Sequence, residues 1–409
     1  MTTDSTTRLT GEALHGVSRG EFIAMMSLIT ATIAISIDTV LPAFDEIEDE
    51  FGLEATNSNI SLTITVFLAA MGIGMLAWGP LADRFGRKRT MYASLVLFIS
   101  GAIVATLANS FGLFLIGRAL WGAAAAGPRT VSLAITRDAY DGDLMSRIMS
   151  LTTAVFLVVP ILAPALGEGL LAIGSWRLTT AAGAAMAVIA AVWFGRLNET
   201  LAPENVMPLQ IGRIGHAART VVSNRHTVGF TVASTMAYGA FFPWLGSSTQ
   251  MIGTIFDREA QFALFFGLNA VFMAVLILIS ERLVNRFGTQ PVLLPATALT
   301  VVAGLGYTVV ALAADGVPNF WTWFALASIL TALNSASTPL MQTRAMEPMG
   351  DIAGTASSVT GAIIFIGGAL LGSIIDRFIT DTVTPFGVGF AIYTGIALVA
   401  IVGATARRR

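Results

Sequence analysis

Long apolar runs alternate with short polar segments along almost the whole 409-residue chain. Twelve apolar runs can be distinguished, and each is long enough to cross the ~30 Å hydrocarbon core of a bilayer as a helix. No water-soluble core could bury so much continuous apolar sequence. The pattern therefore predicts an all-α polytopic membrane protein. The expected spans are 20–43, 58–80, 91–108, 111–136, 147–172, 176–195, 226–252, 260–281, 291–313, 317–343, 352–375 and 383–405.

One internal polar interval is much longer than the others and divides the twelve spans into two groups of six. Within this interval we expect a short amphipathic helix near 209–222. The acidic stretch after the first span, from Asp45 to Glu54, is expected to be a solvated loop. The predicted parts are a tail (1–19), a first six-helix bundle (20–195), a linker (196–225), a second six-helix bundle (226–405) and a basic tail (406–409).

Charge is scarce and unevenly placed. Only 12% of the residues are charged, whereas 55% are hydrophobic; a soluble protein carries roughly 25% charged residues. When the N-terminus is placed in the cytoplasm, 18 Lys and Arg residues fall in cytoplasmic segments and three in outer loops. Because cytoplasmic loops are enriched in these residues, both termini are expected in the cytoplasm. The three histidines lie in or beside polar segments and cysteine is absent, so no metal site is expected.

The loop Gly79–Thr90, with the sequence GPLADRFGRKRT, concentrates charge between the second and third spans. Gly86 permits a tight turn. We expect Asp83 to cap a helix of the other half, and Arg84 and Arg87 to pair across a cytoplasmic gate. The basic residues of the loop also fit the general enrichment of Lys and Arg in cytoplasmic loops. A role in the gate and a role in orienting the protein in the membrane are compatible.

The two halves carry related segments. Asp83–Gly86 after the second span matches Asn285–Gly288 after the eighth, which makes Arg286 and Gly288 a weaker copy of the loop motif. Pro42 and Pro243 are separated by almost the same number of residues as these two loop segments. Two pairs with nearly the same separation along the chain indicate a parallel repeat of six spans.

Two ionisable residues within spans are candidates for function. A carboxylate inside a span is costly and is by default a functional candidate with a partner to be named. Asp38, in the first span, is expected to carry a proton, and Arg118, at similar depth in the fourth, is its expected partner. The alternatives are that Asp38 reaches to the outer interface, or that the two residues only pin helices together.

Three further features of the spans have a functional and a structural interpretation. Arg129 is three turns from Arg118, so it lies on the same helical face and is a possible cavity charge or a structural ion pair. Glu168 is a possible charge of the outer vestibule. Pro160, Pro164 and Gly167 kink the fifth span and let a neighbouring helix approach closely.

These motifs resemble those of the major facilitator superfamily. The loop at 79–90 is similar to the superfamily loop between helices 2 and 3, and Gly117–Gly122 is similar to the motif of helix 4, whose arginine is associated with proton coupling. The fifth span resembles the helix-5 motif of antiporters, in which a tight seam is thought to prevent leak, although Ala163 and Glu168 replace two glycines.

The first half also resembles the Bcr/CflA drug-resistance family of bacterial proton antiporters. The resemblance is carried by Ile37–Ala43, Arg137–Tyr140, Met149–Ser150, Ala163–Gly167 and Ser175–Arg177. It implies a monomer of two six-helix bundles in the bacterial inner membrane. It also implies efflux of amphipathic drugs or small metabolites, driven by the proton gradient without a cofactor or a nucleic-acid partner.

Aromatic and amide side chains of the second half are candidates for the substrate cavity, because aromatic rings offer contact area without fixed hydrogen-bond demands. Most aromatic residues of membrane helices face lipid or neighbouring helices instead. The candidates are Tyr238, Phe241, Phe242, Trp244, Phe265, Asn269, Asn334 and Gln342.

Two other functions stay open at this point. One is a proton-coupled symporter that imports a small nutrient, and the other is a membrane receptor that transports nothing. The sequence contains no nucleophile–base set, metal-ligand cluster or phosphate-binding loop, so an enzyme is not expected.

Overall fold

The computed structural model describes residues 16–53, 60–208 and 211–406, which fold into helices without strands. Twelve of these helices are 18 to 30 residues long. The first half contains α2 (Arg19–Asp38), α4 (Leu62–Phe85), α5 (Arg87–Thr106), α6 (Phe111–Ala139), α7 (Gly142–Leu171) and α8 (Arg177–Phe194). The second half contains α10 (Arg225–Thr249), α11 (Phe262–Phe287), α12 (Thr289–Ala313), α13 (Phe320–Met346), α14 (Ala353–Asp376) and α15 (Thr384–Thr405).

Each of the twelve predicted spans corresponds to one of these helices, with ends that differ by at most six residues. By length and composition, eleven segments of the described chain could cross a membrane. The remaining helix, α10, is as long as the others but is rich in Ser, Thr and Gly. Most of α10 is buried, so its small polar side chains pack against other helices.

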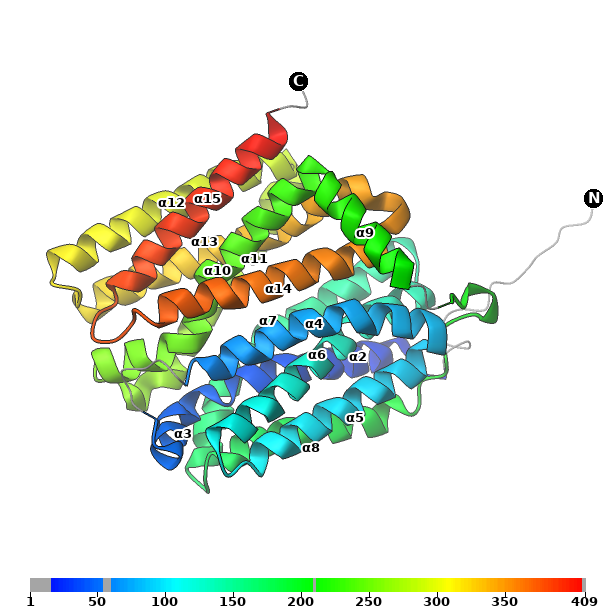
Figure 1. The fold of residues 1–409 in the computed structure, drawn as a ribbon, viewed down its shortest axis with the longest axis horizontal. Helices are drawn as coiled ribbons and strands as arrows, with labels where there is room; N and C mark the ends of the chain where they lie inside the picture. The colour runs from blue at the N-terminus through cyan, green and yellow to red at the C-terminus, as the bar shows by residue number, and fades with distance from the viewer. Residues whose placement is uncertain (1–15, 54–59, 209–210, 407–409) are drawn as a thin grey trace, which may run out of the picture.

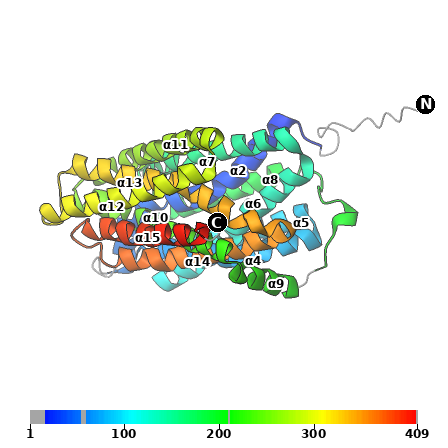
Figure 2. The same cartoon turned by 90° about the horizontal axis from the view of Figure 1, so that it is seen from above.

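The helices run side by side between two ends of the bundle (Figure 1). The first and last described residues lie at one end, together with the loop at 79–90, and we call it the terminal end; the other is the far end. The halves meet along two pairs of helices, α4 against α14 and α7 against α11, as the view from above shows (Figure 2). Gly72 and Gly267 allow this close approach, because a Cβ on either would lie about 3 Å from main-chain atoms of the facing helix.

The predicted repeat has a structural counterpart. Gly86 joins α4 to α5 with φ 94° and ψ 156°, and Gly288 joins α11 to α12 with φ 85° and ψ 168°. Both glycines have a positive φ, which disfavours residues with a side chain. The same turn therefore occurs at the same place in each half.

The predicted amphipathic helix of the linker is α9 (Ile211–Ser223). Its Ala217 and Val221 pack on Met349, Ala356 and Val359, around the start of α14. The helix α9 thus lies against the terminal end of the second half (Figure 1).

The acidic stretch after the first span is not a loop in the structure. Residues Phe44–Phe51 form the helix α3, which buries Phe44 and Ile47 one turn apart. Glu50 accepts hydrogen bonds from the Trp176 indole at 2.6 Å and from the Arg177 guanidinium at 2.5 and 2.7 Å. Glu46 also accepts a hydrogen bond from the Trp176 backbone N–H at 3.1 Å. Together these contacts dock α3 on the start of α8, while Asp45 and Asp49 stay exposed. Glu54, His15 and most of both predicted tails lie outside the described residues.

Candidate functional site

Asp38 is the last residue of α2 and is only 4% exposed. The helix ends there because Pro42, four residues later, has no N–H to donate to the Asp38 carbonyl; a short 3₁₀ turn, Leu41–Ala43, follows. The structure records no hydrogen bond or ion pair for the Asp38 carboxyl group among the described residues. A negative charge at this position would therefore be buried without compensation in this conformation.

Arg118 is fully buried in α6, close to α2. Its Nη1 donates to the Ser36 carbonyl at 2.8 Å, its Nε donates to the Thr63 carbonyl at 3.4 Å, and the Phe67 ring lies 4.5 Å from its guanidinium carbon. Its Nη2 has no hydrogen-bond partner among the described residues. The expected ion pair with Asp38 is absent from the salt bridges of the described chain, because Arg118 binds the α2 backbone two residues earlier instead.

The fifth-span motif forms a tight seam beside Asp38. Pro160 and Pro164 lie inside the continuous helix α7. A Cβ on Gly167 would lie 2.4 Å from the Thr39 carbonyl oxygen and 3.2 Å from the Pro42 ring. Only glycine permits this approach, so α7 packs directly on the chain segment that follows Asp38.

Glu168, the next residue, connects the two halves of the molecule. Its carboxylate accepts a hydrogen bond from the backbone N–H of Ala263 at 2.9 Å. Ala263 is the second residue of α11, where helix N–H groups lack partners within the helix and favour negative charge. One half thus supplies a cap for a helix of the other half near the far end. The sequence placed Glu168 near this end but did not identify its partner.

The loop motif forms its ion pairs within the first half. Arg87 binds Asp83 at 2.5 Å and Asp138, near the end of α6, at 2.8 Å. Glu199 of the linker accepts hydrogen bonds from the backbone N–H groups of Arg87 and Lys88 at 2.8 and 3.0 Å, which caps the start of α5. The expected contacts of Asp83 and Arg87 across a gate are therefore not found among the described residues, because the two residues bind each other and Arg87 also binds Asp138 of the same half.

The other members of the loop motif have different surroundings. Gly79 lies at the crossing of α4 and α14, where a Cβ would be 3.3 Å from the Ser358 hydroxyl. Arg84 and Arg286, on corresponding turns of the two halves, are both exposed. No ion pair to either side chain is found in the described part of the chain.

Some of the cavity candidates gather on one wall of the second half. The ring centroids of Tyr238, Phe242 and Phe365 lie 5.2 to 5.9 Å apart. Gln342 donates to the Tyr238 hydroxyl at 3.1 Å. Arg129 of the first half faces this wall, with its guanidinium carbon 5.7 Å from the Phe365 centroid. Phe365 was not among the predicted residues, because nothing in a uniformly apolar span marks the side that faces the other half.

The remaining candidates are placed elsewhere. Trp244 and Phe265 are almost fully buried in an aromatic cluster at the far end of the second half, with Phe266, Phe320 and Trp323. This packing assigns both to the core of that half rather than to a cavity wall.

Three other candidates also lie apart from the wall. Asn269 donates to Ser328 and Thr331 between α11 and α13. Asn334 binds the Ala237 carbonyl at 3.1 Å, one residue before Tyr238. Phe241 is half-buried against the core.

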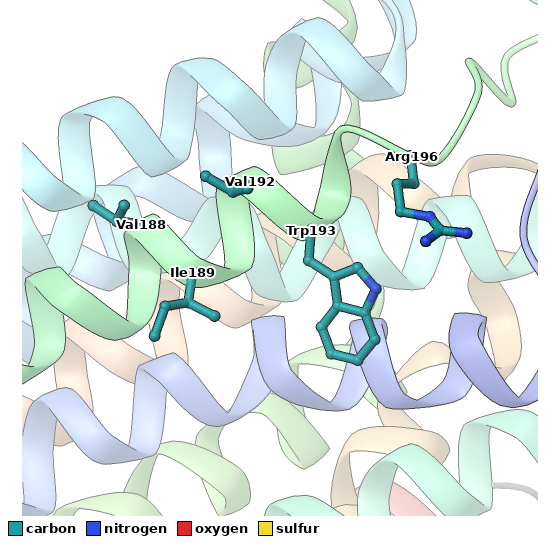
Figure 3. A pocket seen from close by; sticks show the side chains of 5 residues that line it. All are labelled: Val188, Ile189, Val192, Trp193 and Arg196. Atoms are coloured by element: carbon teal, nitrogen blue, oxygen red, sulfur yellow. The ribbon is translucent and has the colours of Figure 1, made fainter.

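Two pockets of the structure are shallow depressions at the periphery. One, of about 590 Å³, lies along α8 and is lined by exposed apolar side chains with Trp193 and Arg196 at its end (Figure 3). The other, of about 610 Å³, lies beside the loop at 79–90. Neither includes Asp38, Arg118 or the aromatic wall. No group of three metal-ligating side chains occurs in the described residues.

Sequence reasoning also missed Asp376, which is buried at the far end of α14. The Ser247 hydroxyl of α10 donates to its carboxylate at 2.6 Å. Asp376 follows directly after an apolar run, and this position was the only signal in the sequence that it could be buried. The signal is weak, because acidic residues in loops commonly occupy the same position.

Comparison with known proteins identifies the fold. The family model of the Major Facilitator Superfamily matches residues 26–372. The chain belongs to this superfamily. It is therefore a multi-pass membrane transporter that acts on small molecules and is not an enzyme, as the sequence analysis expected.

The curated relatives include drug-resistance proteins. A bicyclomycin resistance protein homolog of Haemophilus influenzae is 28% identical over 366 residues, which cover 89% of this chain and 91% of the relative. The multidrug resistance protein MdtL of Salmonella schwarzengrund is 26% identical over 319 residues, covering 78% of this chain and 79% of the relative. These superfamily relatives agree with the resemblance of the first half.

Solved structures confirm the architecture. The D-xylose-proton symporter superposes with a TM-score of 0.74 at 14% identity and covers 94% of this chain and 97% of its own. At this identity the likeness establishes the fold alone. The superfamily fold of two pseudo-symmetric six-helix halves is thus shared by this chain.

Proposed function

We propose that this superfamily member is a proton-coupled exporter of amphipathic drugs or small metabolites. The names of the curated relatives support export, and the excess of Lys and Arg supports a cytoplasmic terminal end. We take the chain to lie in a bacterial inner membrane as a monomer, and the proton gradient to drive it without a cofactor. The far end then faces outward.

The observation that carries the proposal is a pair of groups without partners on two helices that pack together, α2 and α6. Asp38 is buried without a partner, while Arg118 has one buried N–H group that donates to nothing in the described residues. In the proposed cycle a proton occupies Asp38 in the present conformation. Loss of that proton creates a carboxylate, which then pairs with Arg118.

Such a switch couples proton and substrate if each binds the two conformations of the transporter with different affinity. A proton entering from outside neutralises Asp38 and releases Arg118 to the α2 backbone. The halves then open toward the cytoplasm, where the proton leaves and substrate binds. Export follows because the deprotonated, substrate-loaded state favours the outward-open form.

The direction of movement can be measured in proteoliposomes with an acidic interior. An antiporter accumulates substrate inside, about tenfold per pH unit for one proton exchanged at zero membrane potential. A nutrient symporter depletes the interior instead, and a receptor leaves the substrate at equilibrium. Bicyclomycin is the first compound to test, because a relative is named for resistance to it. Protein-free liposomes and collapse of the gradient with nigericin are the controls.

Glu168 offers a separate test of alternating access. Replacing it by alanine removes a cap worth about 1 kcal/mol from α11, so the outward-open population should rise roughly fivefold. Because the chain lacks cysteine, spin labels can be attached at exposed Leu107 and Val317, one in each half at the far end. The longer distance between the labels should gain population. Glu281→Ala, at an exposed residue of α11, serves as the control. If Glu168→Ala leaves the distribution of distances between the labels unchanged, the contact between Glu168 and Ala263 does not hold the far end closed.

A further inference from the structure

Arg129 lies within α6 and is exposed, although it is ten residues from the end of its helix. At 1.5 Å per residue this places it ~15 Å from the cytoplasmic end of α6. Its guanidinium group makes no hydrogen bond or ion pair with the described residues. A charged side chain at such depth is stable only beside water or a counter-charge. Because its contact is with Phe365 of the other half, the exposed side chain lies where the two halves meet.

The facing wall is at the same depth. Tyr238 and Phe365 are thirteen and twelve residues from the cytoplasmic ends of their helices, which corresponds to ~20 Å and ~18 Å. Tyr238 is half-buried, and its hydroxyl oxygen accepts a hydrogen bond from Gln342, so its own O–H can donate elsewhere. Phe242 and Phe365 are buried behind it, so the wall offers the partly exposed Tyr238 ring and one hydroxyl donor opposite a free cation.

Three acidic side chains beside the loop at 79–90 are already engaged. Asp83 and Asp138 both bind Arg87, and Glu199 caps α5. An organic cation entering between the halves would meet Arg129 without a free carboxylate from these residues. An anionic group would gain a charge-assisted hydrogen bond instead.

We propose that Arg129 selects the charge of the exported molecule. The site between Arg129 and the aromatic wall takes compounds that carry an aromatic ring and one anionic or strongly accepting group, such as a carboxylate. The anion binds the guanidinium group while the ring packs on Tyr238, which Phe242 and Phe365 support from behind. This substrate class rests on the proposed function, but binding to the site does not require proton coupling.

Three naphthalene derivatives that share one ring system test the proposal. They are 2-naphthoate, the neutral 2-naphthamide and the cationic 2-naphthylmethylammonium, and their binding to the purified full-length transporter is measured by isothermal titration calorimetry. We expect naphthoate to bind about tenfold more tightly than the amide, the typical gain from one charge-assisted hydrogen bond, and the cation to bind most weakly.

Arg129→Gln should reduce the preference for the anion over the amide to about one, while Arg129→Lys should retain part of it. Tyr238→Phe should weaken all three ligands without inverting their order. Arg219→Gln, an exposed residue of α9, is the matched control and should leave the preference unchanged. The melting temperature of each variant verifies that it is folded.

The proposal is overturned if Arg129→Gln keeps the preference, if the wild type favours the cation, or if none of the three ligands binds. Gradient-driven flux of a bound derivative is measured in parallel. A preference for the anion that depends on Arg129, without flux, would refute the proposed export and leave the binding site intact. Flux without this preference would refute the binding site and leave the proposed export intact.

Discussion

Replacing Asp38 by asparagine is expected to abolish accumulation of substrate in proteoliposomes with an acidic interior. Asparagine has nearly the same shape as aspartate but cannot exchange a proton at neutral pH. In this structure the Asp38 side chain has no recorded partner, so the substitution should not disturb packing. Accumulation driven by the gradient should fall to less than about a tenth of the wild-type value. The effect is this large because the substitution removes the protonation step that drives transport, and not only a single contact.

Exchange of labelled for unlabelled substrate, which needs no gradient, distinguishes lost coupling from lost transport. Asp38→Asn should retain this exchange, because the aromatic wall and Arg129 are unaltered. Asp381→Asn, at an exposed residue near the far end, removes the same charge outside the bundle and should behave like the wild type. Accumulation by Asp38→Asn at the wild-type level would remove this residue from the mechanism.

The sequence was sufficient to predict the helices because bilayer thickness restricts their length. Hydrophobicity locates each span, and the amphipathic pattern of the linker located α9. The same signal failed for α3, where five acidic residues surround only Phe44 and Ile47 as buried contacts. Its docking depends on Glu50 meeting Trp176 and Arg177, residues more than 120 positions away in the chain.

The candidate site could be predicted only in part. Depth along a helix follows from counting residues, so Asp38 and Arg118 were expected at similar levels. The direction of a side chain does not follow from depth, and Arg118 binds the Ser36 carbonyl in this conformation. Likewise, Tyr238 packs on Phe365, which meets Arg129 of the other half, while Trp244, six residues later, packs in the aromatic core of its own half.

The contacts between the halves depend on conformation, which a single sequence does not specify. Asp83 and Arg87 can satisfy each other locally, as they do here. Glu168 and Ala263 meet only while the far end is closed in the proposed cycle. A motif therefore identifies residues able to form a gate, whereas the structure identifies which gate is formed in the state it represents.

Gly167→Ala should damage the seam beside Asp38. The new methyl group would lie 2.4 Å from the Thr39 carbonyl oxygen, and a backbone atom cannot move aside as a flexible side chain can. Overpacking of this kind typically costs about 1–3 kcal/mol. We expect a melting temperature several degrees lower, together with faster proton leak in liposomes that contain no substrate, because α7 must separate from the segment after Asp38.

Gly169→Ala provides the matched control on the same helix. No atom lies within 4 Å of the position of its added methyl group. Alanine is favoured over glycine in a helix by up to about 1 kcal/mol, and this gain applies to both variants. Gly169→Ala should therefore be as stable as the wild type or slightly more stable, with no added leak. Equal stability and equal leak in the two variants would contradict the seam, because only the contact with Thr39 distinguishes them.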